Sequence, residues 1–62
     1  MTKEFLVRRK ETKDAADAAI RSEVMSYLLG LDNPEWKWLK EPEVLFGNGG
    51  WRAYARIEWS RG

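Results

Sequence analysis

The residues of this chain that could do chemistry are carboxylates, lysines, serines and two tyrosines, because it contains neither cysteine nor histidine. That absence excludes a thiolate nucleophile, an imidazole base, a disulfide and a Cys/His zinc site. Carboxylate pairs occur at Glu41 with Glu43 and at Asp14 with Asp17. A general acid needs a pKa raised by a buried pocket, and a small domain has little volume for one. We therefore expect a protein that is not an enzyme and that uses no metal or cofactor.

Residues 47–50, with the sequence Gly-Asn-Gly-Gly, resemble a phosphate-binding loop in composition. The segment lacks the Lys-Ser/Thr tail of such loops and precedes an alternating strand pattern rather than a helix. Asn-Gly between two alternating runs is typical of a type I′ hairpin turn, because both central residues need a positive φ. We therefore predict that Asn48 and Gly49 form the two-residue loop of a β-hairpin.

The composition indicates one small globular domain over residues 1–62, with 44% hydrophobic and 34% charged residues. A chain of this size buries about 60% of its unfolded surface on folding, so its monomer is marginally stable and gains from association. Eleven basic and ten acidic residues leave a net charge of +1. This argues against a broad positive potential of the kind that attracts nucleic acids or membranes. With no signal peptide and no apolar run of about 18 residues, we expect a cytoplasmic protein.

Apolar residues recur at helical spacing from about Lys13 to Leu29. Thr12 or Asp14 can cap the start, and Gly30 is the predicted C′ residue. At 100° per residue, six apolar side chains gather on the stripe that should contact the core: Ala16, Ile20, Val24, Tyr27, Leu28 and Leu31. The sequence therefore predicts one amphipathic helix.

From Glu35 onward the apolar period changes to two, and the predicted turn fixes a register for two strands. The side expected to cover the helix pairs Phe46 with Trp51, Val44 with Ala53, Pro42 with Ala55, Lys40 with Ile57, and Trp38 with Trp59. The opposite side pairs Leu45 with Arg52, Glu43 with Tyr54, Glu41 with Arg56, Leu39 with Glu58, and Lys37 with Ser60. The opposite charges of Glu41 and Arg56 support this register.

Two residues do not fit this pattern, because Lys40 falls on the helix side and Pro42 lies inside a strand. Proline removes a ladder donor, so this strand should lie at an edge or carry a bulge that turns Lys40 outward. Phe5-Leu6-Val7 followed by Arg8-Arg9-Lys10 predicts a short first strand. We expect an α+β fold of order β-α-β-β, with the third strand central in a three-stranded sheet and one helix on one face.

Four tryptophans are more than one helix of this length can cover, since each indole presents roughly 150–250 Å². At least one of Trp36, Trp38 and Trp59 should therefore contact a partner. We predict a partner-binding surface that comprises Trp36, Trp38, Arg52, Tyr54 and Arg56. Met25 and Leu29 lie on the helix away from the apolar stripe, and we predict that they form an oligomer interface bordered by an Asp17–Arg21 pair.

The order and lengths of the predicted elements resemble those of the dodecins, small flavin-storing dodecamers. The resemblance covers most of the chain and rests on topology; the segment Glu11-Thr12-Lys13 lacks the serines that precede a dodecin helix. It implies a flavin-binding oligomer in which Trp36, at the start of the second strand, stacks on the flavin.

The leading hypothesis is a non-enzymatic module that binds a protein and acts as a homo-oligomer. Its expected role is that of an adaptor, or of an inhibitor of the kind that phages encode. The partner's identity is not encoded in any motif of the chain. Two alternatives remain open, the dodecin-like flavin oligomer and weak nucleic-acid binding through arginine and aromatic residues of the sheet.

Overall fold

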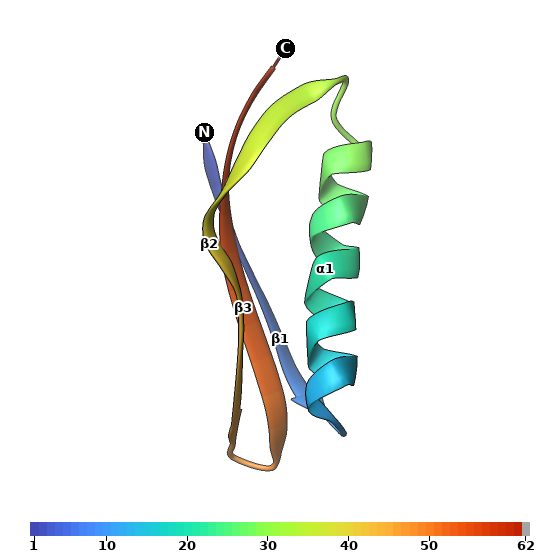
Figure 1. The fold of residues 1–62 in the computed structure, drawn as a ribbon. Coiled ribbons are helices and arrows are strands. Elements are labelled where there is room, and N and C mark those ends of the chain that lie inside the picture. Colours follow the sequence, from blue (N-terminus) through green and yellow to red (C-terminus); the bar gives the residue numbers. More distant parts are fainter. Residues whose placement is uncertain (62) are drawn as a thin grey trace.

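A computed structural model describes residues 1–61 and shows one helix lying along one side of a three-stranded sheet (Figure 1). The elements follow in the order β1 (Thr2–Lys10), α1 (Lys13–Leu29), β2 (Pro34–Gly47) and β3 (Gly50–Arg61). β3 is the central strand, and β1 and β2 are both antiparallel to it. This arrangement confirms the predicted α+β fold class and strand order.

α1 begins and ends where the sequence predicts. Thr12 is the N-cap, and its hydroxyl accepts a hydrogen bond of 3.0 Å from the Ala15 amide. The predicted stripe faces the sheet, with Tyr27 and Leu31 partly buried and four residues fully buried: Ala16, Ile20, Val24 and Leu28. Gly30 caps the helix in a right-handed conformation, with φ −77°. It therefore does not use the left-handed geometry that usually makes glycine the residue after a helix.

The hairpin turn between β2 and β3 has the predicted form. Asn48 and Gly49 both have positive φ, 49° and 91°, as a type I′ turn requires. Next to the turn the predicted pairs are present, namely Phe46 with Trp51, Leu45 with Arg52, Val44 with Ala53, and Glu43 with Tyr54. The turn residues therefore fix the register of the neighbouring part of the ladder.

Beyond Glu43 the predicted register is wrong, because β2 is irregular between Trp38 and Lys40 and again between Lys40 and Glu43. The observed pairs are Trp38 with Ile57, Trp36 with Trp59, Lys40 with Arg56, Lys37 with Glu58, and Glu35 with Ser60. The predicted partners are therefore wrong for six residues: Pro42, Lys40, Trp38, Glu41, Leu39 and Lys37. The bulge turns Lys40 outward, as Pro42 suggested, and puts an indole rather than an ammonium group opposite Ile57.

β1 begins at Thr2, three residues before the predicted start at Phe5, because the 12-residue β3 offers it partners along most of its length. Phe5 and Val7 are buried and Leu6 is exposed, which confirms the predicted alternation. β1 has a bulge of its own: Val7 pairs with Ala53 and Lys10 with Trp51, so two residues oppose one.

This bulge in β1 comes close to the hairpin. Arg9 has a left-handed φ of 57° there, a conformation that costs a non-glycine residue about 1–3 kcal/mol. Gly50 faces it, and a Cβ at that position would lie only 3.0 Å from the Arg9 Cα and the Lys10 carbonyl oxygen. Glycine at position 50 thus permits the end of β1 to approach the hairpin.

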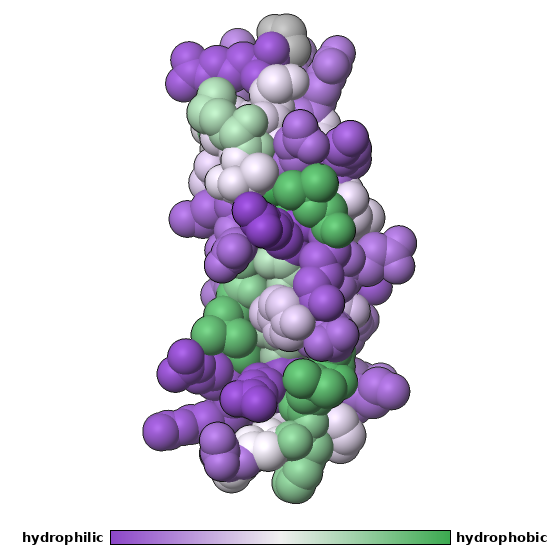
Figure 2. Space-filling view, turned by 90° about the vertical axis from the view of Figure 1, so that its left-hand side faces the viewer, coloured by the Kyte–Doolittle hydropathy of each residue, from purple (hydrophilic) through white to green (hydrophobic). Residues whose placement is uncertain are grey.

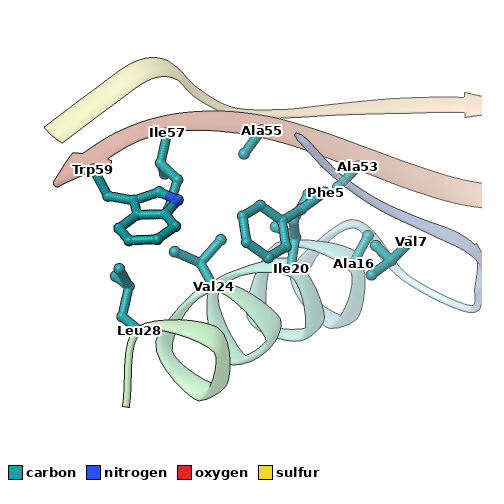
Figure 3. Close-up of a cluster of buried hydrophobic side chains, with 10 residues drawn as sticks. All are labelled: Phe5, Val7, Ala16, Ile20, Val24, Leu28, Ala53, Ala55, Ile57 and Trp59. Carbon is teal, nitrogen blue, oxygen red and sulfur yellow. The ribbon is translucent and has the colours of Figure 1, made fainter. Parts of the chain in front are cut away.

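The hydrophobic core lies between α1 and the inner side of the sheet. Figure 3 shows α1 side chains pointing toward β1 and β3. Ile20, Val24 and Ile57 are its largest fully enclosed members, each contributing roughly 1.5–3 kcal/mol by burial. Tyr27 packs edge-on against both Phe5 and Trp59, with ring centroids 5.7 and 5.9 Å apart.

Candidate functional site

The sheet surface turned away from α1, called here the outer face, is not covered by any element among residues 1–61 (Figures 1 and 2). Its apolar side chains come from all three strands: Leu6 from β1, Leu45 from β2 and Tyr54 from β3. They are 37–47% exposed. Leu39 lies beside them in the β2 bulge and is 45% exposed. Solvent thus reaches large apolar groups at intervals along the whole sheet.

Charged side chains separate these apolar groups, so the outer face is a mosaic of green and purple in Figure 2 rather than one apolar patch. Three ion pairs join charges of opposite sign on this side. Their N···O distances are 3.5 Å for Lys40–Glu43, 3.6 Å for Lys37–Glu58 and 3.9 Å for Arg56–Glu4. Exposed pairs of this kind add little stability, but they leave this part of the surface close to neutral.

Lys40 lies near the middle of the outer face. Its ammonium group lies 5.0 Å from the centre of the Tyr54 ring and 3.5 Å from the Glu43 carboxylate. The Tyr54 side chain and then the Glu43 charge raise the pKa of Lys40 above its usual value. A lysine nucleophile needs its pKa lowered, so the raised pKa of Lys40 favours a cation beside the tyrosine ring over a nucleophile.

The residues of the predicted partner-binding surface lie on two opposite sides of the sheet. Tyr54 and Arg56 are together on the outer face, and Arg52 lies on the same face nearer the hairpin. Trp36 and Trp38 pair with the buried residues of β3 and therefore lie on the helix side. The structure thus brings the arginines and the tyrosine together without the two tryptophans.

The two tryptophans of β2 pack against each other at the edge of the core. Their ring centroids are 5.2 Å apart and their planes are inclined at 83°. Trp38 is partly buried against the core, whereas Trp36 is 37% exposed. Trp36 also lines an open hollow of about 290 Å³ that includes Met1 and Trp59. The Trp59 indole N–H is buried and has no hydrogen-bond partner among residues 1–61.

The residues of the predicted oligomer interface are exposed on α1. Met25 is 42% exposed and Leu29 is 85% exposed, and the two lie one helical turn apart. The predicted Asp17–Arg21 pair is present, with a closest N···O distance of 3.0 Å. This helix surface is therefore available, but it offers only two large apolar side chains.

Sequence reasoning missed one exposed aromatic residue. The predicted register puts Phe46 on the side that covers the helix, yet it is 69% exposed because β2 and β3 extend past the start of α1 (Figure 1). Its ring packs against Trp51, with centroids 5.2 Å apart. The lengths of the two strands relative to the helix were the signal that could have shown this.

No protein family, curated protein or solved structure matches this chain. Among residues 1–61, no group of three or more acidic side chains gathers as a metal site would require. The helix of the described chain is neither long nor apolar enough to cross a membrane.

Proposed function

We propose that this protein is a non-enzymatic protein-binding module whose binding surface is the outer face, and that its first partner is a second copy of itself. The observation that carries the proposal is the uncovered sheet surface on which all three strands present large apolar side chains, Leu6, Leu45 and Tyr54. Solvated sheet faces are ordinarily polar, so covering these groups releases free energy.

The charges of the outer face support a second copy as the partner. A twofold dimer uses the same surface patch on both subunits, so that patch must complement itself. The outer face carries both signs in neighbouring pairs, as Arg56 with Glu4 and Lys37 with Glu58 show. Such pairs can exchange partners across a twofold axis, whereas a surface of one sign would repel its copy.

The size of the molecule is also consistent with association. Its accessible surface is 4549 Å², above the roughly 4,200 Å² expected for a monomer of this mass. It is elongated, with extents of 39 × 17 × 13 Å. A stable interface needs about 800 Å² from each partner, which is under a fifth of this surface. One long sheet face can supply that area.

The finer parts of the proposal concern role and location. A small module of this kind can act in the cytoplasm as an adaptor, or as an inhibitor that blocks a larger partner. The nucleic-acid alternative loses its support on the outer face, because Arg56 is paired with Glu4 and Lys40 with Glu43. A phosphate chain crossing these pairs would meet a carboxylate beside each cation.

Sedimentation equilibrium tests the proposal with two matched variants, Leu6→Lys on the outer face and Met25→Lys on the helix. The two side chains are similarly exposed, at 47% and 42%, and both variants add one positive charge. We expect the wild type to sediment at twice its 7.3 kDa chain mass, Leu6→Lys at the monomer mass, and Met25→Lys like the wild type. Circular dichroism should show that both variants keep the fold.

Two results would contradict the proposal. A wild type that stays monomeric at millimolar concentration would show that the outer face does not bind its copy. A dimer that Met25→Lys dissociates and Leu6→Lys leaves intact would place the interface on α1 instead.

A further inference from the structure

Three arginines come together at the hairpin end of the molecule, apart from the ion pairs of the outer face. Arg8 and Arg9 are the two residues of the β1 bulge, and the bulge sets them opposite Arg52 of β3. With Gly47 and Asn48 of the hairpin they line an open hollow of about 290 Å³. Two strands and a turn therefore bring three arginines into the lining of one hollow.

These three cations have no counter-charge in the described part of the chain. Within residues 1–61, no carboxylate lies within 4.0 Å of Arg8, Arg9 or Arg52. Like charges opposite each other on neighbouring strands repel, and Arg9 in addition has a left-handed backbone. Both features oppose folding, and bulges that re-aim side chains recur next to functional sites.

We propose that Arg8, Arg9 and Arg52 bind a dianionic phosphate group, either inorganic phosphate or a phosphate monoester. The planar fork of each guanidinium fits two oxygens of a phosphate. A monoester has three terminal oxygens and about −1.5 to −2 charges at neutral pH, which suits three arginines approaching from different sides. A carboxylate or a phosphodiester has only two free oxygens and one negative charge, so it would leave part of the cluster unpaired.

The site lies at the hairpin end of the outer face, where Arg52 opposes Leu45, and phosphate binding is measured there separately from the oligomeric state. The group can be inorganic phosphate itself or a phosphate carried on a serine side chain, because both present the same oxygens. The hollow is open to solvent, so a phosphate attached to a larger molecule can reach it.

Titration monitored by ¹H–¹⁵N NMR tests the site, with four probes: inorganic phosphate, a phosphoserine peptide, its unphosphorylated form and an oligothymidylate. We expect the first two probes to shift the amides of Gly47, Asn48 and Gly49 and to saturate. Tighter binding of the phosphopeptide would identify a phosphorylated protein as the source, and equal binding would identify free phosphate. If the oligothymidylate binds more tightly than both inorganic phosphate and the phosphoserine peptide, the assignment to a dianionic phosphate group is overturned.

Arginine variants distinguish a specific phosphate site from a general attraction of phosphate to positive charge. Arg52→Gln and Arg8→Gln should each weaken phosphate binding about tenfold or more, since each removes a charge-assisted bidentate contact. Arg61→Gln is the matched control, because it removes the same charge from the far end of the same strand, about 30 Å away and beyond the screening length of about 8 Å. It should change affinity less than about threefold. Equal losses in all three variants, or no saturable shift in the wild type, would refute the site.

Discussion

Substituting Ile57 tests both the core and the corrected register of β2. Ile57 is fully buried and lies opposite Trp38. Ile57→Ala removes three buried carbon atoms, worth about 2.4 kcal/mol at about 0.8 kcal/mol each, and the remaining cavity raises the expected cost to about 2–5 kcal/mol. A 62-residue chain has a total stability of about 3–9 kcal/mol at typical per-residue values. This variant should therefore lose a large part of its stability.

Urea denaturation followed by tryptophan fluorescence measures this loss as a change in the free energy of unfolding. Leu29→Ala is the control, because Leu29 is 85% exposed and its truncation should change stability by less than about 0.5 kcal/mol. A loss below about 1 kcal/mol for Ile57→Ala would refute the packing described for the core.

A double-mutant cycle then tests the register itself, using the milder change Ile57→Val so that the protein stays folded. Residues in contact show coupling energies of about 0.5–3 kcal/mol, whereas separated residues are additive within about 0.3–0.5 kcal/mol. We expect coupling between Ile57→Val and Trp38→Ala and additivity between Ile57→Val and Lys40→Ala. The reverse result would restore the simple register, in which Lys40 opposes Ile57.

Three further outcomes follow from the structure. Gly49→Val should destabilise the protein by about 1–3 kcal/mol in the same assay, because Gly49 has a φ of 91° that valine adopts with strain; an unchanged unfolding free energy would contradict the type I′ turn. Thr12→Ala should cost about 0.5–2 kcal/mol by removing the bond to the Ala15 amide, and a stability equal to wild type would argue against that cap. Tyr54→Phe should lower the pKa of Lys40 toward its usual value, since contact with Tyr54 is the main cause of its elevation. Lysine-resolved NMR titration reads that shift, and a pKa that stays raised would assign the effect to Glu43.

The parts of the fold that the sequence predicts are those governed by neighbouring residues. The helix from Lys13 to Leu29 follows from local periodicity and from the Thr12 cap. The pairs next to the turn follow from the φ angles that Asn48 and Gly49 must adopt. Local rules of this kind act over one or two turns or a few ladder positions.

The parts that the sequence does not predict depend on contacts between distant segments. Pro42 indicates that β2 is irregular. The number of extra residues depends on the pairing of Trp38 with Ile57, which is a contact between distant segments. No glycine or other turn residue in β1 predicts the bulge at Arg9, which depends on the space that Gly50 leaves. Each bulge shifts the partners that follow it. Simple alternation therefore does not predict the Lys37–Glu58 and Lys40–Glu43 pairs, and it does not place Arg9 opposite Arg52.

The same reasoning explains the divided outcome for the predicted partner-binding surface. Composition identified the unusual residues, and the alternation of β3 places Tyr54 and Arg56 together correctly. Trp36 and Trp38 were joined to them because indoles are common at interfaces, although alternation puts them on the opposite side. The geometry of the sheet therefore divides one predicted surface into two.

The central claim is that a second copy of the chain covers the outer face, and intermolecular nuclear Overhauser effects test it most directly. In a sample that mixes ¹³C-labelled and unlabelled protein, filtered spectra report only contacts between chains. The account predicts such contacts between the Tyr54 ring and the methyl groups of Leu6 and Leu45. Contacts confined to Met25 and Leu29, or no contacts between chains at millimolar concentration, would contradict it.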